Sequence, residues 1–209
     1  MKEYHKIQSV YLRDPETKHK TFLLGQWSVP EFGYLCDLTW IGTEKVDGTN
    51  IRVHWDGATV RFGGRTDDAQ TPTFLIERLM QLFTAEKMAA KFPDATDVML
   101  CGEGYGRKIQ KVGALYLPDS VDFILFDVAY DGVWFQREQV EDVAAGLGIG
   151  VVPVVFRGSL TDAIELVKAG FKSPLGDLTS EGLVLRPAVE LMTRRGNRII
   201  TKVKHRDFQ

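Results

Sequence analysis

The chain has 209 residues, of which 44% are hydrophobic and 26% are charged, and its formal net charge is −2. This composition is typical of a globular protein that buries a hydrophobic core, and the length predicts a single domain over residues 1–209. No apolar run approaches the roughly 20 residues that a bilayer-spanning helix needs. The first residues also lack the apolar core of a signal peptide. The composition therefore argues against a membrane protein and predicts a cytoplasmic one.

Charge is unevenly distributed along the chain. Residues 190–209 carry a net charge of +4, so the remainder carries −6. A basic C-terminal segment is either a solvated face or a site for polyphosphate or a nucleic-acid backbone. The two cysteines, Cys36 and Cys101, show neither metal-ligand spacing nor a disulfide framework.

The first predicted elements are a hairpin and a long helix. Residues 51–62 alternate around Asp56-Gly57, a dipeptide suited to a type I′ turn. Apolar residues recur at helical spacing over 73–91, and Pro93 would end that helix.

The second half of the chain predicts short strands with helices between them. A buried strand over 98–103 leads into a glycine-rich turn. The other expected elements are a hairpin over 122–135 around Asp131-Gly132, helices over 137–146 and 160–169 (the second capped by Ser159 or Thr161), and strands over 151–156, 183–186 and 198–204. Strands joined mainly by hairpins, with helices inserted, predict an α+β domain with antiparallel sheets.

The run from Lys45 to Asn50 reads Lys-Val-Asp-Gly-Thr-Asn and is the most informative segment. A lysine after an apolar stretch and before Asp-Gly is well placed to be a nucleophile. The ordinary lysine pKa of about 10.4 leaves the amine almost wholly protonated at pH 7. The fold would therefore have to favour the neutral amine by burial or nearby positive charge. Taken alone, the pattern is equally typical of a strand running into a turn.

Five further motifs follow in order: Gly63–Thr66, Leu100–Gly106, Phe123–Val128, Glu181–Pro187 and Ile200–Lys204. The series resembles the ordered motifs of covalent nucleotidyltransferases, which include polynucleotide ligases and mRNA capping enzymes. It most resembles the RNA ligase 2-like family of ATP-dependent RNA ligases, over roughly residues 40–204. The resemblance implies two antiparallel sheets flanked by helices, an ATP-grasp-like arrangement enclosing a nucleotide cleft.

The resemblance assigns catalytic roles to three lysines. Lys45 would attack the α-phosphorus of ATP and form a lysyl-AMP intermediate. Lys202 and Lys204 would bind the α-phosphate and favour the neutral form of Lys45. Alternatively, Lys202 and Lys204, two positions apart, would simply lie on the exposed face of a strand.

Two acids are implied near the nucleotide. Glu103 would contact ribose or a metal-bound water, and Glu181 would be a metal-site carboxylate. Mg²⁺ or Mn²⁺ suits both, because Mg²⁺ prefers oxygen ligands. The alternative for each is a surface glutamate at a strand end.

The remaining implied nucleotide contacts each have a structural alternative. Phe126 would stack on the purine or lie in the core. Glu44 would accept the adenine amino group or lie on the surface. Arg65 would touch the nucleotide or the substrate's terminal phosphate.

The implied nucleic-acid contacts are basic. The glycine-rich segment 104–111 carries Arg107, Lys108 and Lys111, which suit a phosphate backbone or a mobile surface turn. Arg186 would serve the leaving phosphates, although the family often has a lysine at this position.

Asn50 favours RNA, because DNA ligases commonly carry arginine at the matching position. The chain ends at Gln209, five residues after Lys204, so no C-terminal OB or helical domain is expected. A homodimer or an accessory domain would then supply the contacts that such a C-terminal domain makes with the substrate. We therefore predict an ATP-dependent RNA ligase for RNA repair, acting on RNA in a nicked duplex or an RNA/DNA hybrid. The alternatives are a GTP-dependent capping guanylyltransferase and a non-catalytic nucleic-acid-binding relative.

Overall fold

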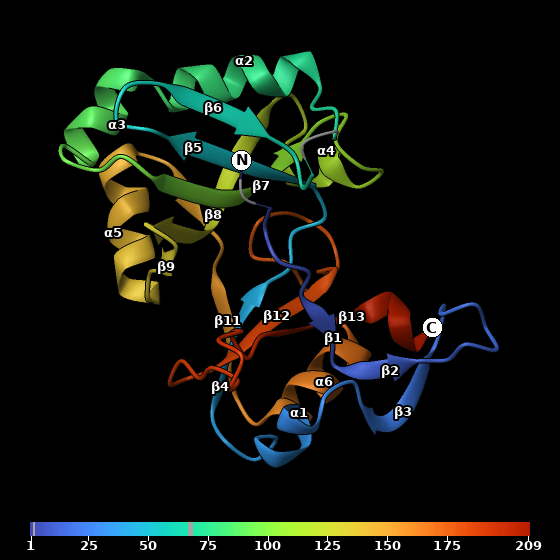
Figure 1. Ribbon diagram of the computed structural model, residues 1–209. Helices are drawn as coiled ribbons and strands as arrows, with labels where there is room; N and C mark the ends of the chain where they lie inside the picture. Colours follow the sequence, from blue (N-terminus) through green and yellow to red (C-terminus); the bar gives the residue numbers. More distant parts are fainter. Residues whose placement is uncertain (2, 67–68) are drawn as a thin grey trace. The chain divides into compact units, whose positions relative to one another are not determined.

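The computed structural model describes residues 1, 3–66 and 69–209, and the chain forms two compact units (Figure 1). Unit 1 comprises Met1–His5 and Asp47–Val152. Unit 2 comprises Lys6–Val46 and Pro153–Gln209. Within the described residues, no helix combines the length and apolar character needed to cross a membrane.

Unit 1 is built on one sheet with the strand order β10-β8-β7-β5-β6, and β9 pairs with β8. Its strands are β5 (Thr49–Trp55), β6 (Val60–Gly63), β7 (Val98–Gly106), β8 (Val121–Tyr130), β9 (Val133–Trp134) and β10 (Gly150–Val151). All pairings are antiparallel except that of β10 with β8.

The core of unit 1 lies on one face of this sheet. The helices of the unit are α2 (Thr73–Leu82), α3 (Ala85–Lys91), α4 (Gly113–Tyr116) and α5 (Arg137–Leu147). Leu75 and Leu79 of α2 and Val143 of α5 are buried in the same cluster as Ile51 and Leu125 of the sheet. Alternation places Asn50, Arg52 and Cys101 on the opposite face, which therefore carries both polar and apolar side chains.

Unit 2 is built on a sheet with the order β1-β13-β12-β4-β11. Its elements are β1 (Gln8–Ser9), β2 (Tyr11–Arg13), β3 (Phe22–Trp27), α1 (Pro30–Tyr34), β4 (Trp40–Glu44), β11 (Val154–Gly158), α6 (Leu160–Ala169), β12 (Gly182–Pro187), β13 (Thr201–Lys204) and the 3₁₀-helix η1 (His205–Phe208). Strands β2 and β3 form a separate hairpin. Helix α6 packs Leu160 and Val167 into a core with Trp40, Leu183 and Val203.

The predicted α+β class is confirmed, with a difference in the sheets. Each main sheet is mixed, because β1 runs parallel to β13 in unit 2 and β10 runs parallel to β8 in unit 1. The prediction of purely antiparallel sheets is therefore wrong at one edge of each sheet. Both parallel strands have only two residues and reach their partners from distant parts of the chain, which local hairpin signals do not detect.

The predicted helix over 73–91 is two helices, α2 and α3. The break falls at Phe83-Thr84, where the Thr84 hydroxyl accepts a hydrogen bond from the Lys87 backbone N–H and begins α3. The predicted end before Pro93 is confirmed, since α3 stops at Lys91.

Two predicted strands have different extents. The strand expected over 151–156 is split between β10 and β11, which belong to different sheets, with Pro153 between them. The strand expected over 98–103 continues to Gly106. Within this strand, Gly102 lets β7 pack closely against Phe123 of β8, because a Cβ at position 102 would lie 2.2 Å from Cζ of Phe123.

One of the two predicted hairpin turns is confirmed. Asp131 and Gly132 both have positive φ, 47° and 78°, as a type I′ turn requires. At the first hairpin only Gly57 has positive φ, and the connection spans Asp56–Thr59 because Trp55 pairs with Val60. Asp56 Oδ1 accepts bonds from the Ala58 and Thr59 N–H groups, which stabilises this longer loop.

The Thr84 cap gives a test of this helix break. Thr84→Ala removes the hydroxyl that satisfies an N–H of α3, and we expect it to lower the free energy of unfolding by about 1 kcal/mol. Urea denaturation measures this. Thr73→Ala is the matched control, because no side chain caps α2, and it should change stability by less than about 0.5 kcal/mol. Equal effects would contradict the capping role.

Candidate functional site

In unit 2, one carboxylate bridges two predicted catalytic lysines. Glu181 Oε2 lies 2.6 Å from Nζ of Lys45, and Glu181 Oε1 lies 2.6 Å from Nζ of Lys204. The side chains of Lys45, Lys204 and Glu181 are only 21%, 13% and 11% exposed. We call these three residues the lysine–glutamate triad. Its ions are largely withdrawn from water, so their mutual geometry matters more than that of a surface pair.

Strand pairing places the triad. The Lys45 N–H donates to the Gly182 carbonyl oxygen at 2.9 Å, which extends β4 alongside β12. Gly182 is in turn the Cα partner of Lys204 on β13. Lys45 and Lys204 therefore flank Gly182 in adjacent strands, and Glu181 precedes it.

Lys202 shares a face of β13 with Lys204. Alternation along the strand buries Thr201 and Val203 and leaves Lys202 and Lys204 half-buried on the other face. The structure thus brings the two C-terminal lysines to one side of the sheet, as the sequence predicts.

Only glycine fits at position 182. Its φ is +150°, and a Cβ there would lie 2.0 Å from the Val203 carbonyl oxygen. The close approach of β12 to β13 at this point fixes where Glu181 leaves the sheet. The glycine after the motif acid is thus a geometric requirement of the triad.

The two lysines control the protonation of Glu181. Burial acts to raise the pKa of Glu181, but the charges of Lys45 and Lys204 and their hydrogen bonds outweigh it and lower that pKa below its ordinary value. Glu181 is therefore an anion at neutral pH. It holds the two ammonium groups on either side of one carboxylate.

This arrangement differs from the predicted environment of Lys45. The sequence predicts cationic neighbours that favour the neutral amine, whereas the group nearest to Nζ is the carboxylate of Glu181. Attack by Lys45 on a phosphate would require Nζ to leave this contact with Glu181.

Glu44 lies on the buried side of β4. Its side chain is 1% exposed, and it is the register partner of the core residue Leu183. Burial raises the pKa of Glu44, and the neighbouring hydroxyls of Ser173 and Ser180 lower it in part. Neither carboxylate oxygen makes a hydrogen bond of good geometry. Glu44 thus sits in the interior, not on the surface.

In unit 1, the polar face of the sheet carries Asn50 and Glu103. They are direct Cα partners on β5 and β7, so their side chains lie on the same face. The Oδ1 atom of Asn50 is buried and has no hydrogen-bond partner among the described residues. A buried carbonyl oxygen in this condition is suited to a donor supplied by a ligand.

Three residues of unit 1 were not singled out by the sequence. Arg52 is fully buried and donates from Nε to the Gly64 carbonyl oxygen at 2.6 Å. Tyr4 donates its hydroxyl to the buried Asp127 at 2.5 Å. Arg52 follows Asn50 by two positions and so lies on the same strand face. This alternation could have identified Arg52 from the sequence.

Phe126 occupies an irregular position of β8. The pairing of β7 with β8 shifts between Cys101 and Gly102, and Phe126 is the extra residue opposite that shift. It is half-buried, and its ring lies 5.2 Å from the Tyr4 ring in an edge-on contact. Strand alternation would place Phe126 in the core, but the bulge interrupts that alternation at this residue.

The basic residues predicted to contact nucleic acid are mostly exposed. Arg65, Arg107, Lys108 and Lys111 are exposed in unit 1, and Arg186 is half-buried on β12 of unit 2. Among the described residues, the side chain of Arg107 makes one long ion pair, of 3.5 Å, with exposed Asp119.

The loop that follows β7 contacts the Asp47-Gly48 turn. Gln110 Nε2 donates to the Gly48 carbonyl oxygen at 2.9 Å, and the Asp47 N–H donates to the Tyr116 hydroxyl at 3.3 Å. These bonds tie the glycine-rich segment to the turn within unit 1.

The predicted metal ligands do not form a preformed cage. No group of three or more His, Cys, Asp or Glu residues suited to a metal ion occurs in the described part of the chain. Both oxygens of Glu181 are already bound by ammonium groups. A divalent ion would thus need phosphate oxygens and water for most of its coordination.

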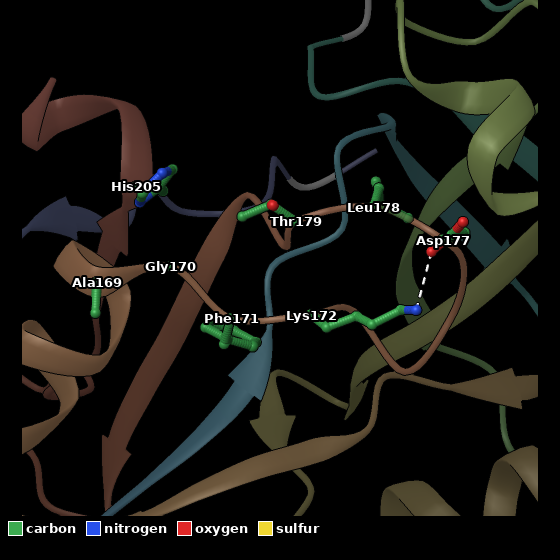
Figure 2. A pocket seen from close by; sticks show the side chains of 8 residues that line it. All are labelled: Ala169, Gly170, Phe171, Lys172, Asp177, Leu178, Thr179 and His205. Atoms are coloured by element: carbon green, nitrogen blue, oxygen red, sulfur yellow. Dashed lines mark ion pairs between the residues drawn. The ribbon is translucent and has the colours of Figure 1, made fainter.

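A hollow of about 510 Å³ lies beside the hairpin that leads to Glu181. Figure 2 shows the ion pair between Lys172 and Asp177 across this hairpin, with His205 at the other end of the hollow. Lys172 Nζ lies 2.9 Å from Asp177 Oδ1. His205 Nδ1 lies 2.9 Å from the Val167 carbonyl oxygen, which connects η1 to α6. None of the residues lining this hollow was predicted as a site residue.

The fold is similar to that of part of a solved RNA ligase. A Naegleria gruberi RNA ligase, as an E312A mutant with AMP and Mn, matches with a TM-score of 0.69 at 15% identity, covering 98% of this chain and 56% of that chain. The K326A mutant with ATP and Mn gives 0.66 at 18% identity, covering 86% and 54%. The same ligase with PPi gives 0.69 at 17% identity, covering 98% and 56%.

Residues 38–204 match the family model described as RNA ligase, so this chain belongs to the RNA ligase family. It spans about half the length of the solved ligases that it matches. A search of the curated proteins finds no match.

Glu181→Gln tests the charge of the triad through pH. The pKa of Glu181 is lowered in the folded chain, so its ion pairs stabilise the fold above the unfolded pKa of about 4.3 and are lost as pH falls through the folded value. We expect the variant to lose about 3 kcal/mol at pH 7 and to converge with the wild type in acid. Urea denaturation across pH measures this. Glu165→Gln, in an exposed pair with Lys168, is the control and should change little.

Gly182→Ala tests the close approach of β12 and β13. The added Cβ would meet the Val203 carbonyl oxygen, so we expect a loss of more than about 2 kcal/mol in unfolding free energy. Gly196→Ala, with positive φ but nothing within 4 Å of its Cβ, separates backbone strain from this clash and should lose less. Similar losses in both variants would show that strain alone explains the effect.

Proposed function

We propose that this chain carries the nucleotidyltransferase activity of an ATP-dependent RNA ligase and that Lys45 becomes covalently bound to AMP. The observation that carries the proposal is the triad, in which the motif lysine Lys45 is held beside Lys204 by Glu181. Membership of the RNA ligase family supports it. Structures of the similar Naegleria ligase contain ATP, AMP, Mn or PPi.

In the first step the lone pair of Lys45 Nζ attacks the α-phosphorus of ATP. A phosphorus–nitrogen bond forms, the bond to the β-phosphate oxygen breaks, and pyrophosphate leaves with that electron pair. The ammonium of Lys45 must lose a proton before attack. An α-phosphate bound by Lys202 and Lys204 would compete with Glu181 for Lys204 and would stabilise the negative charge that develops on phosphorus.

The next two steps transfer AMP and seal the strand. An oxygen of a 5′-phosphate attacks the α-phosphorus and displaces Lys45, which gives an adenylylated RNA end. The 3′-hydroxyl then attacks that 5′-phosphate, a phosphodiester bond forms, and AMP leaves. Mg²⁺ or Mn²⁺, carried mainly by the phosphates, would neutralise phosphate charge.

The polar face of unit 1 supplies nucleotide contacts in this proposal. The unpaired Oδ1 of Asn50 is suited to accept a bond from a ribose hydroxyl. Glu103, on the same face, would contact ribose or metal-bound water. Phe126 would stack on the purine from its bulge, and Arg65 would touch the nucleotide or a terminal phosphate.

Several finer assignments complete the proposal. Glu44 would accept the adenine amino group and so favour ATP. Arg107, Lys108, Lys111 and Arg186 would contact phosphates of the RNA. An accessory domain or a second copy of the chain would help to hold a nicked duplex.

Labelling with α-³²P-ATP tests the proposal. We expect acid-labile label on the wild type and at least a 100-fold loss in Lys45→Ala, because no other amine can replace the nucleophile. Lys87→Ala is the control, since Lys87 lies on α3 away from the motifs, and its labelling should be unchanged. Sealing of 5′-phosphorylated RNA nicks would be measured on the same preparations.

Each contrary result has a meaning. Full labelling of Lys45→Ala would refute the assigned nucleophile. Labelling by GTP in preference to ATP would favour a capping guanylyltransferase. RNA binding without any nucleotide transfer would favour a non-catalytic relative.

A further inference from the structure

A second hollow lies beside the catalytic lysines within unit 2. It has a volume of about 800 Å³, and Lys202 and Lys204 form part of its lining. Four further cations line it from outside β13, namely Lys6, Arg13, Lys20 and Arg206. We call this hollow the basic pocket.

The N-terminal strands build the basic pocket onto β13. Strand β1 runs parallel to β13, with Ser9 opposite Lys202. Arg13 fixes the neighbouring hairpin, because it donates to both carboxylate oxygens of Asp207 at 3.0 and 2.9 Å and to the His19 and Lys20 carbonyl oxygens at 3.3 and 3.4 Å. The contacts of Arg13 therefore fix the backbone around the basic pocket, while Lys6, Lys20 and Arg206 stay exposed at its surface.

The charge of the basic pocket is unbalanced. Lys6, Lys20 and Arg206 are exposed, and none of them makes an ion pair within the described residues. Asp207 is the single acid in the lining, and Arg13 neutralises it. Clustered cations at a concave surface attract polyanions.

The RNA ligase family match does not account for this charge. The match covers residues 38–204, and Lys6, Arg13, Lys20 and Arg206 all lie outside it. The charge that these residues add beside the two motif lysines therefore lies outside the region that the family model covers.

We propose that the basic pocket binds the sugar–phosphate backbone of the RNA strand whose 5′-phosphate receives AMP. This inference rests on the proposed function, because it assigns Lys202 and Lys204 to the AMP phosphate that the 5′-phosphate attacks. The strand behind that 5′-phosphate must then leave along a surface next to these lysines. Cations before β1, between β2 and β3, and in η1 match a chain of repeated phosphates.

The size of the basic pocket argues for a strand instead of pyrophosphate. Its volume of about 800 Å³ is at the upper end of the range for whole small-molecule sites, which is roughly 300–1,000 Å³. Two linked phosphates would fill only a small part of this volume.

The test is a triple variant, Lys6→Ala with Lys20→Ala and Arg206→Ala. Fluorescence anisotropy with a 5′-phosphorylated 12-nucleotide RNA measures Kd over a range of salt concentrations. Each lost phosphate contact lowers the salt slope by about 0.7, so the slope should fall by about 2 and the affinity at 0.1 M salt by on the order of 100-fold. The matched control replaces Arg157, Lys168 and Lys172 by alanine, which removes the same charge from unit 2 outside the basic pocket, and it should retain at least a third of the affinity.

Labelling of Lys45 by α-³²P-ATP is measured on the same proteins. We expect the triple variant to lose far more RNA affinity than labelling rate. A parallel loss of both, with weaker competition by inorganic pyrophosphate, would overturn the inference and assign the pocket to the leaving group. An unchanged RNA salt slope would also overturn it. Failure of the wild type to label would refute the proposed function, whereas labelling with no RNA binding would refute the inference alone.

Discussion

The candidate site depends on the double ion pair that Glu181 makes with Lys45 and Lys204. The carboxylate joins Lys45 from the end of β4 to Lys204 from β13 with two contacts of 2.6 Å. Two ammonium groups this close and this buried would repel each other without an anion between them. Glu181 thus allows the sheet to hold Lys45, the proposed nucleophile, beside Lys204, the proposed phosphate-binding cation. One carboxylate contacts both lysines, so any change in the contact of one lysine affects the other through Glu181.

Backbone geometry gives this triad its precision. Gly182 lets β12 approach β13 so closely that no Cβ fits, and the Lys45 N–H bonds to its carbonyl oxygen. The ends of three strands are therefore fixed relative to one another by main-chain contacts, and the charged side chains only have to bridge short gaps. Sites built on strand ends in this way lose little conformational entropy when they bind a ligand.

The N-terminal segment extends unit 2 beyond the family motifs. Strand β1 adds an edge to the sheet beside Lys202, and Arg13 anchors the following hairpin to Asp207 of η1. Because Asp207 is neutralised there, Lys6, Lys20 and Arg206 impose their charge on the basic pocket. A chain with a net charge of −2 therefore concentrates positive charge where its motif lysines lie. The overall charge gave no indication of this, since it averages over acidic surfaces elsewhere.

The sequence by itself determined the α+β class, most element positions and the motif residues, because periodicity, turn dipeptides and motif order are local signals. It also placed Lys202 and Lys204 on one face, since strand alternation has a period of two. Only the tertiary structure decided that Glu181 contacts Lys45, that Glu44 is buried, and that Arg52, Tyr4 and Asp127 support the polar face of unit 1. These contacts join residues distant in the chain, and strand register, which depends on the packing of the whole sheet, sets them.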